Sequence, residues 1–145
     1  MRIGKVALLI AAVLNGGIAL FHLLLFALPQ KALVFILAPD WVRSSSLSQL
    51  LFISVSFGAL FALFAWYAFS GAGIGPRLPL LRSVLVFLAI LYLFRGLVLI
   101  QELRLSATRP GIILPPQEFF YSAVAFTIGL LYAVGLRGQW ARPRK

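Results

Sequence analysis

An arginine lies inside a long apolar run between Leu81 and Leu103, and a glutamate follows it seven residues later. In a helix Arg95 and Glu102 are two turns apart, about 10.5 Å along the axis and on nearly the same face. A guanidinium in a membrane costs about 2.5–3.5 kcal/mol on insertion scales, so a partner should offset that cost. We expect Arg95 to bind Glu102, a polar group of another helix or a ligand anion. The alternatives are a purely structural pair with Glu102 or snorkelling to the headgroups.

Other polar residues are predicted to share the half of the protein that holds Arg95. By the rise of about 1.5 Å per residue, His22 lies about 9 Å, and Arg95 about 12 Å, below the end of its apolar run. Simpler structural roles exist: packing for His22 and helix capping for Gln49 and Glu118. As a set, these residues predict a pocket that opens outward and binds an anionic or amphipathic molecule. The predicted ligand-binding residues are Arg95, Glu102, His22, Gln49, Gln101, Glu118 and Tyr121.

The residue content excludes several kinds of chemistry. The chain has no cysteine, one histidine and three acids, so disulfides, thiolate metal sites and cysteine nucleophiles are ruled out. The glycine-rich stretch 71–75 is not followed by the Lys-Ser/Thr pair of a phosphate-binding loop. We therefore expect no catalytic residue, no metal ligand and no cofactor.

The elements that position these residues are predicted to be membrane helices. Hydrophobic side chains make up 62% of the chain and charged ones 11%, against about 45–50% and about 25% in soluble domains. Apolar runs of near 20 residues cover 6–28, 47–69, 81–103 and 117–136, each enough to cross a hydrocarbon core of about 30 Å. The sequence predicts an all-α integral membrane protein with one four-helix domain over 1–145. We expect it in the cytoplasmic membrane of a bacterium.

Local signals mark where these helices begin and end. Ser46 and Gln49 fit a capping box that starts the second helix, and Pro115-Pro116 fits the start of the fourth. The stretch 71–76, rich in glycine and closed by proline, ends the second. The apolar piece 32–38 lies between two prolines and is too short to span. It predicts an interfacial or re-entrant segment in the first outer loop.

Small residues recur every fourth position and predict close helix packing in a compact bundle. Such a stripe runs along the first, second and fourth helices, whereas the third has none. Asn15 with Gly16-Gly17 indicates close packing or a kink. The alternative is that one stripe faces a second copy of the chain or another subunit. The stripes are Ala7, Ala11, Asn15 and Ala19; Ser54, Gly58 and Ala62; and Ala125, Gly129 and Ala133.

The basic residues predict how the helices are oriented. Cations are enriched in cytoplasmic loops. The face that would hold both termini carries eight, and the other face four. Both termini are therefore predicted to be cytoplasmic, with a basic tail over 137–145 that binds anionic lipids. The eight are Arg2, Lys5, Arg77, Arg82, Arg137, Arg142, Arg144 and Lys145, and the four are Lys31, Arg43, Arg104 and Arg109.

Three functions fit these observations. The first is a binding module for an anionic or amphipathic small molecule or lipid. The second is a non-catalytic accessory subunit, and the third is an enzyme for a lipidic substrate, with only His22 and Glu102 as acid–base candidates. The expected partners are membrane lipids, another membrane protein or a second copy of the chain. Nucleic acid is not expected, because the cations lie between apolar runs.

The predicted orientation can be measured with reporters fused after Lys145. A fluorescent protein that matures only in the cytoplasm should be bright, and alkaline phosphatase, which needs the periplasm, should be inactive. An active phosphatase fusion together with a dark fluorescent fusion would contradict the orientation predicted from the eight-to-four count.

Overall fold

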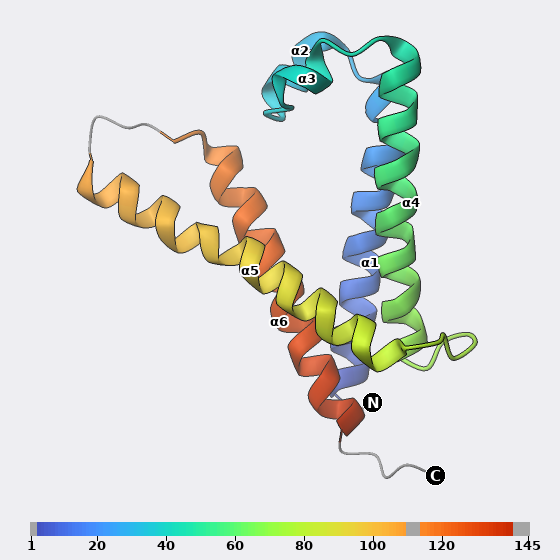
Figure 1. Ribbon diagram of the computed structural model, residues 1–145. Helices are drawn as coiled ribbons and strands as arrows, with labels where there is room; N and C mark the ends of the chain where they lie inside the picture. Colours follow the sequence, from blue (N-terminus) through green and yellow to red (C-terminus); the bar gives the residue numbers. More distant parts are fainter. Residues whose placement is uncertain (1–2, 110–113, 141–145) are drawn as a thin grey trace.

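The structure, a computed structural model, describes residues 3–109 and 114–140, except the side chains of residues 30 and 138–140. The described chain is all-α, with four long helices (Figure 1). They are α1 (Ile3–Leu23), α4 (Leu47–Gly71), α5 (Leu81–Thr108) and α6 (Pro116–Trp140). Each is long and apolar enough to cross a membrane, which indicates an integral membrane protein. Residues 1–2 and the 141–145 part of the predicted basic tail lie outside the described residues.

Short elements join α1 to α4 and form what we call the outer segment, residues 24–46. It contains η1 (Leu25–Ala27), α2 (Gln30–Phe35) and α3 (Asp40–Arg43). A small apolar cluster of Leu25, Leu33, Val42 and Leu50 packs it onto the first turn of α4. The predicted non-spanning piece 32–38 thus forms the end of a six-residue helix and the turn after it. Its place at the membrane interface stays a prediction.

The helix boundaries agree with the sequence signals at some ends and differ at others. The capping box at the start of α4 is confirmed: Ser46 Oγ accepts from the Gln49 N–H, and Gln49 Oε1 accepts from the Ser46 N–H at 2.9 Å. The first helix ends at Leu23, not at 28, because the Leu24 N–H is shared between the carbonyls of Leu20 and Phe21 and the chain tightens into a 3-10 turn. The third runs to Thr108, beyond the predicted 103, since polar residues continue it after the apolar run.

The four helices form two pairs, α1 with α4 and α5 with α6 (Figure 1). The pairs meet at a closed end, which holds the start of α1 and the end of α6, and diverge toward an open end beneath the outer segment. The predicted compact bundle is therefore compact over part of its length only. The main core lies toward the closed end and includes Leu8, Ala68, Leu88 and Ile128, one from each helix. Beyond Tyr92 the buried residues of α5 are Gly96 and Glu102, which face α6.

Small residues bring the helices of each pair into close contact. A Cβ on Gly58 of α4 would lie 2.5 Å from a side-chain carbon of Leu23 in α1. One on Gly129 of α6 would lie 2.7 Å from the backbone nitrogen of Leu93 in α5. The predicted stripes of α4 and α6 therefore pack inside the chain at these positions. The third helix, for which no stripe was predicted, also has a close contact, at Gly96.

A buried polar network joins all four helices within the core. Asn15 of α1 is fully buried, and its Nδ2 donates to the Ala11 carbonyl at 2.8 Å and to the Tyr132 hydroxyl at 3.2 Å. The Tyr92 hydroxyl of α5 donates to Asn15 Oδ1. The Tyr132 hydroxyl of α6 donates to the Phe64 carbonyl of α4 at 3.2 Å. Asn15 is thus a packing residue, because its amide satisfies hydroxyls that no water can reach.

Gly96→Ala should destabilise the protein, whereas Gly17→Ala should not. A Cβ at Gly96 would lie 2.5 Å from the Phe126 Cα, so α5 and α6 would have to separate, at a cost of about 1–3 kcal/mol. At Gly17 a Cβ meets nothing within 4 Å, and alanine should add up to about 1 kcal/mol through helix propensity. Thermal unfolding in detergent measures both variants. Equal melting temperatures would contradict the close approach at Gly96.

Candidate functional site

Arg95 and Glu102 are connected through a serine of the neighbouring helix. Arg95 Nη1 donates to Ser122 Oγ at 2.8 Å, and Ser122 Oγ donates to Glu102 Oε1 at 2.8 Å. The three side chains form a row from guanidinium to hydroxyl to carboxylate between α5 and α6. Arg95 therefore binds a polar group of another helix, as expected, and reaches Glu102 through a hydroxyl rather than in a direct ion pair.

Helix geometry and close packing place this row. Arg95 and Glu102 lie seven residues apart, which returns α5 to nearly the same face after about two turns. Gly96 lets α6 approach that face. Ser122, fully buried, lies where the two helices meet. Sequence reasoning missed Ser122, because a serine in an apolar run carries no signal that distinguishes a partner on another helix from a carbonyl of its own.

Burial differs sharply along the row. Glu102 is 6% exposed, and its Oε2 has no hydrogen-bond partner among the described residues. Arg95, by contrast, is exposed. Its contact with Ser122 is the one hydrogen bond that it makes to the described part of the chain. The guanidinium therefore keeps free donors, and it is the group of the three that a ligand can reach.

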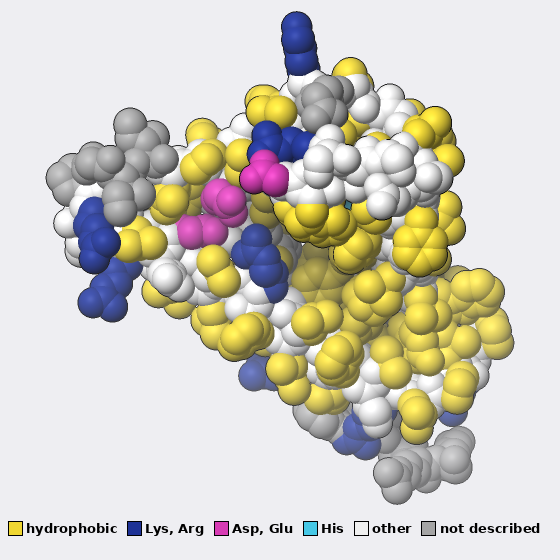
Figure 2. Space-filling view, turned by 45° about the horizontal axis from the view of Figure 1, so that its top comes forward, with side chains coloured by type: hydrophobic (Ala, Val, Ile, Leu, Met, Phe, Trp, Pro, Cys, Tyr) yellow, Lys and Arg dark blue, Asp and Glu magenta, His cyan; other side chains and the backbone are white. Residues whose placement is uncertain are grey.

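The surface around the open end is chemically divided. Figure 2 shows acidic and basic side chains beside a hollow between the outer segment and the α5–α6 pair. Below the hollow in the same view the surface is mostly hydrophobic, and basic side chains appear again near the closed end. The arrangement places charged groups beside an opening whose walls are apolar.

Tyr121 and Gln117 hold the outer segment against α6. The Tyr121 hydroxyl donates to the Ile36 carbonyl at 3.1 Å, and Gln117 Nε2 donates to the Phe35 carbonyl at 3.2 Å. These two carbonyls belong to the last residue of α2 and to the residue that follows it. The predicted Tyr121 thus connects α6 to the outer segment, one residue before Ser122 in the sequence. Glu118 is half-buried in the first turn of α6.

His22 packs within the α1–α4 pair and does not join the Arg95 row. Its Nδ1 lies 2.8 Å from the Ile18 carbonyl, so this nitrogen donates. The rings of Phe57 and Phe61 lie 5.9 and 4.9 Å from the imidazole, centre to centre. The predicted proximity to Arg95 does not become a contact, and the packing interpretation accounts for this histidine. An acid–base pair of His22 with Glu102 has no support in these contacts.

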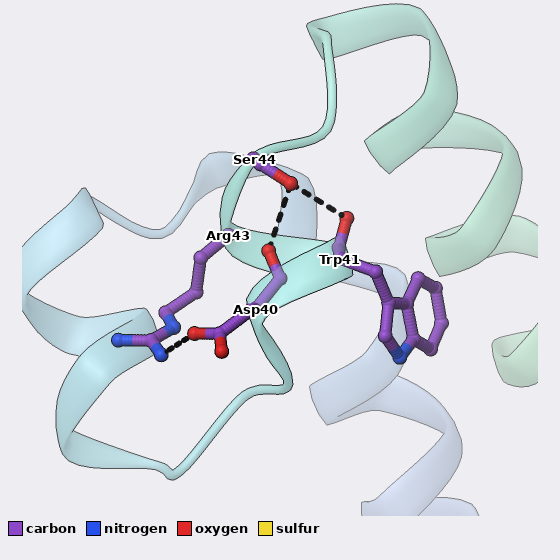
Figure 3. A network of polar contacts seen from close by, with 4 residues as sticks. All are labelled: Asp40, Trp41, Arg43 and Ser44. Atoms are coloured by element: carbon purple, nitrogen blue, oxygen red, sulfur yellow. Dashed lines mark hydrogen bonds and ion pairs between the residues drawn. The ribbon is translucent and has the colours of Figure 1, made fainter.

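Gln49 lines a groove of about 650 Å³ beside the outer segment. Polar groups in and next to this groove make their contacts within that segment. Ser44 Oγ donates to the Asp40 carbonyl at 2.8 Å, Arg43 pairs with the Asp40 carboxylate, and Ser45 Oγ donates to the Trp41 carbonyl at 2.6 Å. Figure 3 shows the first two of these contacts and the exposed ring of Trp41. Gln49 completes the capping box. Gln49 thus has a structural role at the start of α4, and its predicted role in ligand binding stays a prediction.

Gln101 belongs to a different surface from Arg95. Six residues rotate a helix by about 600°, which leaves Gln101 about 120° away from Arg95, whereas Glu102 is about 20° away. Gln101 is exposed and lines a separate groove with Arg104 and Thr108. Of the seven predicted residues, the structure connects Arg95 with Glu102 through Ser122. The other five make no hydrogen bond to this row among the described residues: Tyr121, Glu118, Gln49, Gln101 and His22.

Ser122→Ala should destabilise the protein more than Ser54→Ala. Both serines are fully buried in long helices. Ser122→Ala removes both hydrogen bonds of the row and leaves the buried Glu102 carboxylate without its donor. This should lower the free energy of unfolding by about 1–3 kcal/mol. Ser54 Oγ has no partner among the described residues, so its loss should change stability by less than about 0.5 kcal/mol or increase it. Equal shifts in detergent melting temperature would mean that the row contributes nothing to stability.

Comparisons with protein-family models, with curated proteins and with solved structures find no match. The contacts of Arg95, Ser122 and Glu102 are therefore the observations that bear on function. A functional proposal rests on the chemistry of these side chains and on the exposure of Arg95.

Proposed function

We propose that the protein is a membrane binding module whose site, centred on Arg95, holds the anionic headgroup of a lipid or another amphipathic small molecule. One observation carries the proposal. The exposed guanidinium of Arg95 donates to Ser122, and Ser122 donates to Glu102, which is 6% exposed. A guanidinium that served only to neutralise Glu102 would be expected to contact the carboxylate directly. Here its other donors point to no described group of the protein.

The chemistry of arginine supports an anionic ligand. Its planar fork matches the oxygens of a carboxylate or phosphate with two parallel hydrogen bonds. Glu102 behind Ser122 balances the cation when no ligand is bound, which lowers the cost of holding Arg95 at membrane depth. A single guanidinium beside a buried carboxylate suits a ligand with one negative charge better than one with several, because further charges would face Glu102.

The surroundings of the site support an amphipathic ligand. The two helix pairs diverge above the main core (Figure 1), and the surface below the hollow is mostly hydrophobic (Figure 2). An apolar tail can lie along such walls while its headgroup stays at Arg95. We place the open end on the outer side of the membrane, with both termini in the cytoplasm, on the strength of the cation count.

A second candidate is an accessory subunit of a membrane complex. The divergence of α1–α4 from α5–α6 favours it, because a helix of another protein could fill the opening and offer an acid to Arg95. In that case the chain would need its partner to be stable. A monodisperse, stable monomer in detergent would argue against this candidate and for the binding module.

Arg95→Leu should abolish binding of an anionic amphiphile without unfolding the protein. Leucine is cheaper than arginine in a membrane, so insertion should not suffer. Loss of a charge-assisted hydrogen bond of about 1.5–3 kcal/mol weakens binding by about tenfold or more. Binding of a fluorescent fatty acid and thermal unfolding should be measured on the same detergent samples. Arg77→Leu, an exposed site at the closed end, is the charge-matched control.

The two measurements together separate the roles of Arg95. Weaker binding with an unchanged melting temperature supports the site. A fall in both assigns Arg95 to the fold. If neither changes, Arg95 only snorkels, and the proposal is wrong.

A further inference from the structure

A second polar surface runs along the opposite face of α5. Leu97, Gln101, Arg104 and Thr108 are spaced by three or four residues and form one stripe. Arg104 is nine residues from Arg95, or about two and a half turns, which places it on the far side of the helix. This stripe therefore faces away from Ser122, and nothing in the Arg95 site involves it.

The stripe lines a groove of about 560 Å³ with a polar and an apolar end. Gln101, Arg104, Thr108 and Arg109 form the polar end. Leu97 and Ile100 form the apolar end, and Leu105 lies between the polar residues. The order along the helix, apolar first and basic last, is that of a lipid with its chains in the membrane and its headgroup at the surface.

The positive charge of the groove is not balanced within the described chain. Gln101, Arg104 and Arg109 are exposed, and their side chains make no hydrogen bond or ion pair to a described residue. The Thr108 hydroxyl donates to the Arg104 carbonyl at 2.7 Å. Glu102, the nearest acid in sequence, is buried and turned toward Ser122. None of the residues along the groove is acidic, so two guanidinium groups and an amide are available as donors.

The length of α5 places these donors at the depth of lipid phosphates. The helix has 28 residues, about 42 Å at 1.5 Å per residue, whereas the hydrocarbon core is about 30 Å thick. The helix is inclined to α1 and α4 (Figure 1), and a helix of this length crosses the core at a tilt of up to about 40°. Arg104 and Arg109, at the end of the helix, then lie nearest to the headgroups, and Leu97 and Ile100 lie deeper, toward the acyl chains.

We propose that this groove binds one glycerophospholipid with a net negative headgroup, in the leaflet at the open end. Its phosphodiester oxygens accept hydrogen bonds from Arg104, Arg109 and Gln101, and an acyl chain lies on Leu97 and Ile100. A choline or ethanolamine headgroup would bring a cation beside the arginines, so an anionic lipid such as phosphatidylglycerol is preferred. A second copy of the chain fits less well, because paired copies of this face would set arginines against arginines.

Native mass spectrometry of the full chain, titrated with phosphatidylglycerol in detergent, tests the proposal. The double variant Arg104→Gln/Arg109→Gln should lose one tightly bound lipid, with affinity about tenfold to thirtyfold weaker, since each basic residue at the surface adds about one factor of five. The control Arg77→Gln/Arg137→Gln removes the same charge from exposed positions at the closed end and should keep that lipid. Arg95→Leu should also keep it, because the two sites lie on opposite faces of α5.

Three results would overturn the proposal. They are retention of the lipid by the Arg104 and Arg109 double variant, equal loss in the Arg77 and Arg137 control, and equal binding of phosphatidylcholine by the unaltered chain. Because the site is independent of Arg95, failure of the fatty-acid experiment leaves this test unaffected.

Discussion

Inside a bilayer an unpaired polar group is costly, because no water is present to supply its hydrogen bonds. This constraint accounts for two polar networks between the long helices. Toward the closed end, Asn15 and the hydroxyls of Tyr92 and Tyr132 satisfy one another and reach the Phe64 carbonyl, so one network connects all four long helices. Between α5 and α6, Ser122 connects Arg95 to Glu102. The first network is closed on itself, whereas the second leaves part of a guanidinium and Glu102 Oε2 without partners among the described residues.

The difference between the two networks follows from their positions. Asn15 is fully buried among residues of the main core, where any free donor would be costly. Arg95 lies past Tyr92, where α5 has left the α1–α4 pair and packs on α6 alone. An arginine there can keep free donors because it is exposed. Beyond Tyr92 the buried residues of α5 are only Gly96 and Glu102, which leaves the Arg95 side chain accessible.

The sequence predicted the helices well and their partners poorly. Long uncharged runs are nearly sufficient evidence for membrane helices, and the capping box at Ser46 predicted the start of α4 to the residue. The sequence did not show that Glu102 faces α6 and Gln101 does not. One residue rotates a helix by about 100°, and only the packed structure shows which side faces α6. Ser122 carried no signal at all, and the close approach at Gly96 depends on the backbone of Phe126, far away in sequence.

The divergence of the helix pairs also gives the described chain a wedge shape. With α1–α4 and α5–α6 together at the closed end and apart at the open end (Figure 1), the described chain is narrower at one end than at the other. At the wide end, the hydrogen bonds of Gln117 and Tyr121 join α6 to the outer segment. A wedge that crosses a bilayer occupies a smaller area in one leaflet than in the other, and it fits a curved membrane better than a flat one.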